Sequence, residues 1–158
     1  KCLDAWTPHI TVGSGIVVPQ ERQQETDEAF RKIADQQSTF NLTLSGFGGT
    51  TEWKGARKGI TTPYVLWVNP VVNEPLMKLF NTIVDKVTSK YDTFYTRIAE
   101  YIPHVTVAYG DLTKGGYEKG EEYLKTIDFK DEINIPHIAL VENFPDNDVE
   151  YKRFYFKK

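Results

Sequence analysis

One five-residue phrase occurs twice in this chain, as PHITV at residues 8–12 and as PHVTV at residues 103–107. Side chains of an extended segment alternate between two faces, so the histidine and the threonine of each copy share one face and the apolar residues share the other. The phrase therefore predicts two strands, each with its apolar residues in a core. Facing each other, the two strands would present two imidazoles and two hydroxyl groups as a symmetrical site.

Length and composition limit the classes of protein to consider. With 158 residues, 40% hydrophobic and 26% charged, the chain is long enough for a single domain, or for two small lobes that share a core. The net charge of −3 gives no general attraction to nucleic acid, so recognition of phosphate requires a local patch. A lone cysteine, Cys2, excludes an internal disulfide. The sequence has no bilayer-spanning run and no signal-peptide pattern, and we expect a cytoplasmic protein without a membrane partner.

The segments around the two phrases show regular hydrophobic spacing. It predicts the order strand, helix, strand, strand, helix, strand, helix, strand, strand, so each phrase is followed by a helix and two strands. Asn73 is the predicted N-cap of the second helix, and Leu124 and Ile127 are expected to be buried by the third. The predicted helices cover residues 20–37, 74–90 and 113–128, and the predicted strands cover residues 8–18, 40–45, 64–68, 103–109, 133–141 and 151–156.

Two histidines and two hydroxyls suit acid/base chemistry on a phosphate group. Histidine titrates near neutral pH, so one imidazole of a pair can take a proton from an attacking oxygen while the other gives a proton to the leaving oxygen. A threonine hydroxyl on the same face can donate to a phosphate oxygen that is not being displaced. This scheme requires no metal ion.

The paired His-x-Thr phrases resemble the signature of the two-histidine (2H) phosphoesterase superfamily, which includes 2'-5' RNA ligase-like proteins, cyclic phosphodiesterases and 2'-5' oligoadenylate phosphodiesterases. The resemblance implies a bilobal α+β fold in which two mainly antiparallel sheets face a central cleft, with helices outside. It also implies cofactor-free, metal-independent cleavage of nucleotide phosphodiesters. His9 and His104 would be the acid/base pair, and Thr11 and Thr106 the phosphate donors. Members usually have a strand and a helix ahead of the first phrase. We therefore expect a single domain over residues 1–158, in which either this N-terminal piece is missing from the chain or the first lobe is built with one strand fewer.

Other candidate residues lie between the two phrases. Trp53, Lys54 and Arg57 belong to a predicted hairpin tip, where an indole ring could stack on a base and the cations could hold phosphate. An ordinary solvated loop is the alternative interpretation. Tyr64 is a further candidate for binding substrate, but it and Trp67 fall on opposite faces of one strand, so at most one of them reaches the site.

Two residues are expected to be structural. His137 opens a third Pro-His-apolar phrase, but Ala139 stands where the other copies have threonine, so the hydroxyl is missing. Tyr109 is out of phase with His104 along its strand and is expected in the core.

The favoured function is a phosphodiesterase acting on a nucleotide or short RNA, with a 2',3'-cyclic phosphate, a 2'-5' oligonucleotide or a cyclic oligonucleotide as substrate. No obligate protein partner is inferred. The alternatives are a 2'-5' RNA ligase that uses the same residues in reverse, a nucleotide- or RNA-binding module without turnover, and a metal hydrolase. No third ligand stands in recognisable spacing to either histidine, which disfavours the metal hydrolase. Which histidine is the base stays open.

Overall fold

The protein is represented by a computed structural model, which describes residues 8–13, 15–53, 62–92, 101–143 and 148–158. The chain divides into two units, each drawn from three separate segments. Unit 1 comprises the described parts of Lys1–Thr11, Thr43–Val71 and Ile102–Ile133. Unit 2 comprises the described parts of Val12–Leu42, Val72–Tyr101 and Asn134–Lys158.

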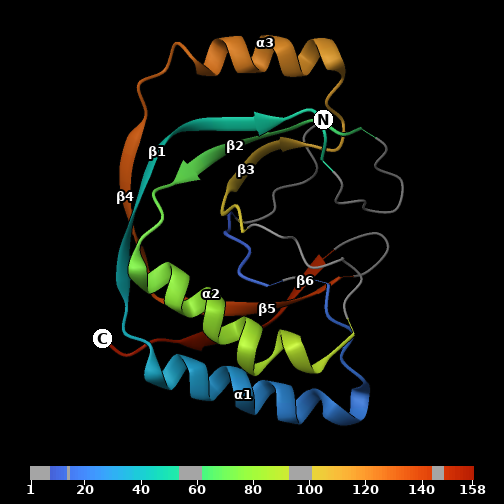
Figure 1. The fold of residues 1–158 in the computed structure, drawn as a ribbon, viewed down its shortest axis with the longest axis vertical. Helices are drawn as coiled ribbons and strands as arrows, with labels where there is room; N and C mark the ends of the chain where they lie inside the picture. The colour runs from blue at the N-terminus through green and yellow to red at the C-terminus, as the bar shows by residue number, and fades with distance from the viewer. Residues whose placement is uncertain (1–7, 14, 54–61, 93–100, 144–147) are drawn as a thin grey trace. The chain divides into compact units, whose positions relative to one another are not determined.

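Helices and strands alternate along the chain and give an α+β protein (Figure 1). Unit 1 contains β2 (Val65–Pro70), β3 (Val105–Tyr109) and α3 (Lys114–Leu124). Unit 2 contains η1 (Gln20–Arg22), α1 (Gln23–Gln36), α2 (Glu74–Lys86), η2 (Thr88–Lys90), β5 (His137–Asn143) and β6 (Asp148–Tyr155). Two strands, β1 (Phe40–Thr50) and β4 (Lys130–Ile135), start in one unit and end in the other.

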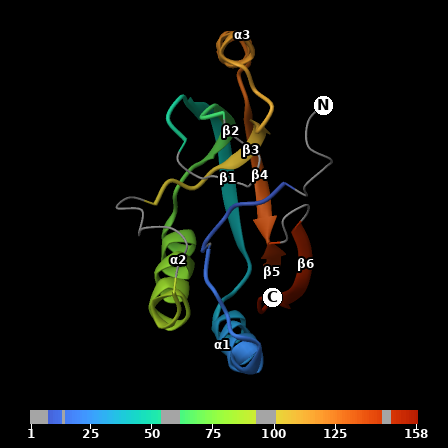
Figure 2. The same cartoon turned by 90° about the vertical axis from the view of Figure 1, so that its right-hand side faces the viewer.

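Unit 1 is built on a four-stranded sheet in the order β3-β2-β1-β4. The pairs β1–β2 and β2–β3 are antiparallel. Leu44, Val68 and Val105, one from each of three strands, form a buried cluster on one face of this sheet. The same face carries Leu66, against which α3 packs through Gly120, where a Cβ atom would lie 2.7 Å from the Leu66 Cδ1 atom. Figure 2 shows α3 end-on beside this sheet.

A β-bulge in β3 decides which side chains face away from α3. Trp67 is paired with Thr106, whereas the preceding Leu66 is paired with Ala108, so Val107 is an extra residue on β3. An extra residue shifts the alternation of side chains by one position. Val107 is accordingly 45% exposed rather than buried, and Tyr109 lies on the same face as Thr106.

Unit 2 packs two helices and a two-stranded antiparallel sheet around aromatic side chains. Phe30 of α1 stacks on Phe154 of β6, with ring centroids 6.0 Å apart. Helix α1 also contacts α2, and Figure 2 shows both helices with β5 and β6. Asn73 caps α2, because its Oδ1 accepts a hydrogen bond from the backbone N–H of Leu76 at 3.1 Å.

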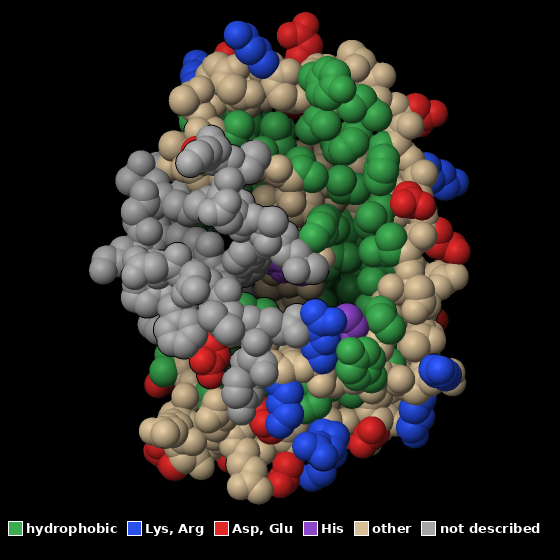
Figure 3. Space-filling view, turned by 180° about the vertical axis from the view of Figure 1, so that it is seen from behind, with side chains coloured by type: hydrophobic (Ala, Val, Ile, Leu, Met, Phe, Trp, Pro, Cys, Tyr) green, Lys and Arg blue, Asp and Glu red, His purple; other side chains and the backbone are tan. Residues whose placement is uncertain are grey.

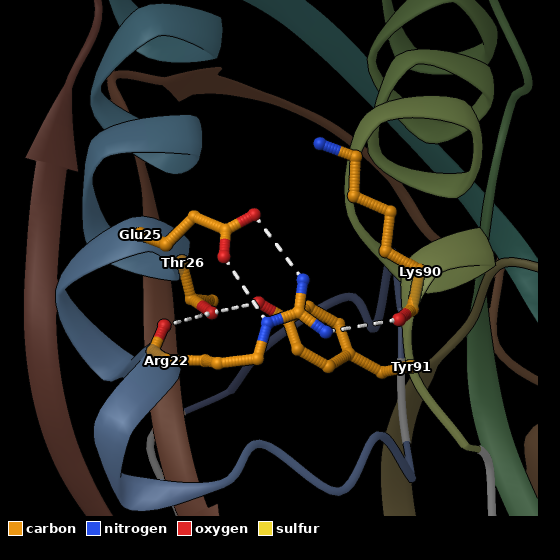
Figure 4. Close-up of polar contacts among 5 residues, drawn as sticks. All are labelled: Arg22, Glu25, Thr26, Lys90 and Tyr91. Atoms are coloured by element: carbon orange, nitrogen blue, oxygen red, sulfur yellow. Dashed lines mark hydrogen bonds and ion pairs between the residues drawn. The ribbon is translucent and has the colours of Figure 1, made fainter.

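The start of α1 is held by a polar cluster (Figure 4). The guanidinium of Arg22 donates twice to Glu25, at 3.1 and 3.2 Å, and lies 4.5 Å above the ring of Tyr91. The Tyr91 hydroxyl in turn bonds Thr26, and Arg22 also donates to the carbonyl of Lys90. The hydrogen bond from Arg22 lowers the pKa of Glu25 and raises that of Arg22. These contacts attach α1 to the segment that follows α2.

The structure confirms the predicted α+β class, the element order from the first helix to the third, and the Asn73 cap. The first phrase is different: residues 8–11 carry neither helix nor strand. The predicted strand 133–141 divides into β4 and β5 at Pro136, which lacks the N–H needed to continue a ladder.

The third helix ends earlier than predicted. It stops at Leu124, and Ile127 lies beyond it and is 36% exposed, while Tyr117 is the residue that α3 buries. Over the face seen in Figure 3, hydrophobic side chains gather towards the end of the molecule that holds α3, and Lys and Arg are interspersed with Asp and Glu. No helix in the described part of the chain is both long and apolar enough to cross a bilayer.

Candidate active site

The second phrase places His104 just before β3 with its ring orientation fixed. Nδ1 of His104 lies 2.8 Å from the carbonyl oxygen of Ile102. A carbonyl only accepts, so Nδ1 carries the hydrogen of this bond. In the neutral imidazole this leaves the lone pair on Nε2, which is therefore the nitrogen available to exchange a proton. Val105 is buried, and Thr106 is exposed on the opposite side of the strand, as the alternation predicts.

Aromatic rings surround the His104 imidazole. The centroid of the Trp53 ring lies 5.2 Å from that of His104 in an edge-on arrangement, and the Trp67 centroid lies 5.4 Å away. Trp53 also contacts Tyr109, at 6.4 Å. The expectation that Tyr109 belongs to the core is therefore wrong, because the bulge at Val107 brings it to the histidine's face.

The first phrase contributes its apolar residue to the same core as the second. Ile10 packs against the cluster that contains Val105. His9 and Thr11, on either side of Ile10, are exposed. Although residues 8–11 are not a strand, the side chains alternate as an extended segment would, and the histidine and the threonine point away from the core. Residues 8–11 of the first phrase and all of the second phrase belong to unit 1.

The remaining predicted substrate contacts divide into three cases. Trp53 is next to His104, as described above. Tyr64 instead contacts Tyr117 of α3, with ring centroids 5.7 Å apart and the rings tilted by 35°, and so lies on the other face of the sheet from His104. This placement favours Trp67 over Tyr64 as the residue of that strand near the site. Lys54 and Arg57 lie outside the described residues.

Sequence reasoning missed a residue next to Trp67. Asn69 lies two positions further along β2 on the same face, and its Oδ1 accepts a hydrogen bond from Trp67 Nε1 at 2.8 Å. The available signal was the period of two along a strand that begins beside the site.

His137, the third histidine, belongs to unit 2. Its ring lies 5.3 Å from the ring of Tyr155, across the β5–β6 pair. This position agrees with a structural role. No group of three His, Cys, Asp or Glu side chains is arranged to bind a metal ion within the residues that the structure describes.

An α+β fold with two Pro-His-x-Thr-Val phrases, whose histidines and threonines lie outside a common core, defines the class of two-histidine phosphoesterases. The family model of the 2'-5' RNA ligase superfamily matches residues 1–148, and the chain belongs to this superfamily. Comparison with curated proteins gives no significant match.

Three solved structures share the fold at low sequence identity. TT0787 of Thermus thermophilus superposes with a TM-score of 0.66 at 14% identity, over 99% of this chain and 82% of that one. A protein described as a phosphoesterase superposes with a TM-score of 0.67 at 16% sequence identity, over 100% of this chain and 82% of that one. E. coli LigT, in complex with 3'-AMP, superposes with a TM-score of 0.61 at 16% sequence identity, over 96% of this chain and 78% of that one.

Proposed function

We propose that this protein is a metal-independent phosphodiesterase that cleaves a phosphodiester in a nucleotide or at an RNA end, with His9 and His104 as its acid/base pair. The observation that carries the proposal is the setting of His104. Its Nδ1–H is bound by the Ile102 carbonyl, so Nε2 is left for proton transfer, and the Thr106 hydroxyl is exposed on the same face.

The reaction on a 2',3'-cyclic phosphate requires two proton transfers. A water oxygen forms a bond to phosphorus while the bond from phosphorus to one ribose oxygen breaks. One histidine takes a proton from the water, and the other gives a proton to the leaving ribose oxygen, so the charge balances. Each transfer contributes about 10²- to 10⁴-fold to the rate. Thr11 and Thr106 donate hydrogen bonds to the phosphate oxygens that stay bound to phosphorus.

The nucleotide class of substrate is supported by two observations. The solved structure of LigT holds 3'-AMP, a nucleotide with a phosphate on its ribose. In this chain, Trp53 presents an indole ring beside His104, and such rings bind bases by stacking, which is worth about 1–3 kcal/mol per base. Lys54 and Arg57 follow Trp53 in the sequence and are proposed as phosphate contacts. Candidate substrates are 2',3'-cyclic phosphates, 2'-5' oligonucleotides and cyclic oligonucleotides.

The test is a panel of these substrates, with a 3'-5' dinucleotide, incubated in EDTA and analysed by mass spectrometry. We expect hydrolysis by the wild-type protein and a loss of kcat of about 10²- to 10⁴-fold in His9→Ala and in His104→Ala. His137→Ala is the matched control and should retain wild-type kcat. Full activity in either His9→Ala or His104→Ala would refute the acid/base assignment, and loss of activity in EDTA alone would favour a metal hydrolase.

RNA ligation is the second candidate, because the matching family is described by its 2'-5' RNA ligases. The same two histidines would then activate a 5'-hydroxyl instead of water and form a 2'-5' bond. Incubation of an RNA that ends in a 2',3'-cyclic phosphate with a 5'-hydroxyl RNA distinguishes the two, since only a ligase yields the joined product.

A further inference from the structure

Strands β2 and β3 are neighbours in the unit 1 sheet (Figure 1), and their pairing locates Asn69 relative to His104. Strands β2 and β3 pair Trp67 with Thr106 and Val68 with Val105 in antiparallel register. One step further along this register, Asn69 is opposite His104. Directly opposite residues of an antiparallel pair have their Cβ atoms about 4.5–5.5 Å apart. The Asn69 amide is therefore a near neighbour of the proposed acid/base group.

The orientation of the Asn69 amide is fixed by Trp67. The indole Nε1–H only donates, and it lies 2.8 Å from the side-chain oxygen of Asn69. The amide NH2, with its two donor hydrogens, must then point away from the indole. Among the described residues this NH2 group makes no hydrogen bond. The result is a half-buried, neutral donor held in one orientation beside His104.

Strand β1 is shaped to hold this Trp67–Asn69 pair. Gly48 is paired with Trp67. A Cβ atom on Gly48 would lie 2.5 Å from Trp67 Nε1 and 2.8 Å from Asn69 Oδ1, so the pair occupies the space above the glycine. Strand β1 thus leaves room, at Gly48, for the Trp67–Asn69 pair that β2 contributes.

We propose that Asn69 is a substrate-binding residue whose amide NH2 donates a hydrogen bond to an oxygen of the phosphate group, and that Trp67 is its positioning residue. The inference rests on the proposed function, because it assumes that the phosphate lies at His104 and Thr106. Phosphate oxygens only accept at neutral pH, and Asn69 supplies donors without adding charge to the histidine's surroundings. The phosphate would then receive one hydrogen bond from Asn69 on β2 and another from the Thr106 hydroxyl on β3.

The direct test is Asn69→Asp, which keeps the shape of the side chain but replaces the donor with an anionic acceptor. We expect the affinity for 3'-AMP, measured by calorimetry, to fall by about 10- to 100-fold, as for loss of a hydrogen bond to a charged group. The affinity for adenosine, which lacks the phosphate, should change less than twofold. Asn81→Asp is the matched control, since it places the same charge on the exposed face of α2 in unit 2.

Trp67→Phe removes the Nε1–H and keeps an aromatic ring. We expect it to weaken 3'-AMP binding by about 2- to 10-fold, less than Asn69→Asp, because the amide remains but can rotate. Thermal unfolding of each variant separates a folding defect from a lost contact.

Equal losses for adenosine and 3'-AMP in Asn69→Asp, or no loss for either, would overturn the inference. A wild-type protein that binds 3'-AMP but turns over no substrate refutes the proposed function alone, and the Asn69 comparison is then still decided by binding. A wild-type protein that neither binds 3'-AMP nor turns over any substrate would overturn both.

Discussion

Gly48 and Gly49 are neighbours in β1 that face opposite sides of the sheet, and alanine at each should separate activity from stability. A Cβ on Gly48 would meet the ends of two side chains, Trp67 and Asn69, at 2.5 and 2.8 Å. A Cβ on Gly49 would meet the Val65 carbonyl oxygen at 2.9 Å, on the adjacent strand. Side chains can rotate out of the way, whereas a paired backbone cannot move without disturbing the sheet.

These distances set the expected magnitudes. Gly48→Ala gives up one hydrogen bond, worth about 1 kcal/mol, and gains about 0.5–1 kcal/mol from replacing a strand glycine, so its free energy of unfolding should be nearly unchanged. Gly49→Ala overpacks the sheet at a cost of about 1–3 kcal/mol, partly offset by the same gain. The net loss of stability in Gly49→Ala corresponds to a Tm about 1–8 °C below that of wild type for a chain of this length.

Activity should fall more in Gly48→Ala than in Gly49→Ala, the reverse of the order expected for stability. Gly48→Ala displaces the indole beside His104, and a displacement of about 1 Å at a reacting group can cost up to about 100-fold, so we expect kcat/KM to fall about 10- to 100-fold. Near-UV circular dichroism should report the new environment of Trp67. Gly115→Ala, in the first turn of α3 where a Cβ meets no atom within 4 Å, is the control for both measurements. Wild-type kcat/KM and an unchanged spectrum in Gly48→Ala, or a lower Tm in Gly48→Ala than in Gly49→Ala, would refute this reasoning.

Two further predictions concern stability. Burial, and to a smaller extent the Glu121 carboxylate, raises the pKa of Tyr117 in the folded protein. The neutral Tyr117 side chain therefore contributes its full stabilisation below the pKa of about 10 that it has in the unfolded chain. This stabilisation is lost as the pH rises through the higher pKa of the folded state. Above about pH 10 the Tm of Tyr117→Phe should therefore fall less steeply than that of wild type, and parallel curves would contradict this. Asn73→Ala removes the acceptor for the Leu76 N–H and the donor to the Asn41 carbonyl. It should lower the free energy of unfolding, measured in urea, by about 1–2 kcal/mol. Asn73→Ser keeps a capping oxygen and should lose less stability, and equal losses in the two variants would argue against the cap.

Local alternation alone predicted which side of each histidine phrase is buried as far as Thr106, but not the exposed Val107 that follows it. Val105 is buried and Ile10 packs against its cluster, while His9, Thr11 and Thr106 are exposed. The pattern also predicted a strand for the first phrase, and this prediction was wrong. A strand needs a partner with free N–H and C=O groups, and that depends on chain segments far away in the sequence.

The bulge at Val107 explains why the aromatic surroundings of His104 were only partly predicted. Nothing in the local sequence marks it, since valine is a good strand former without the freedom of glycine. The bulge follows from the register that β3 adopts against β2. Once alternation shifts, Tyr109 joins the histidine's face, where it contacts Trp53. A prediction that counts positions from His104 alone therefore places Tyr109 on the wrong side.

The third Pro-His phrase separates the structural part of the repeated motif from its chemical part. At His137 the following residue, Ile138, is buried, just as Val105 is, and the Pro136 carbonyl accepts a hydrogen bond from the N–H of Phe156. Proline, histidine and a buried apolar residue thus occur together in strand packing without any need for catalysis. What unit 2 lacks at this position is the hydroxyl, because Ala139 takes the place of threonine. Packing explains the apolar position in all three copies but not the threonine in two of them, and the proposed binding of phosphate would account for the threonine.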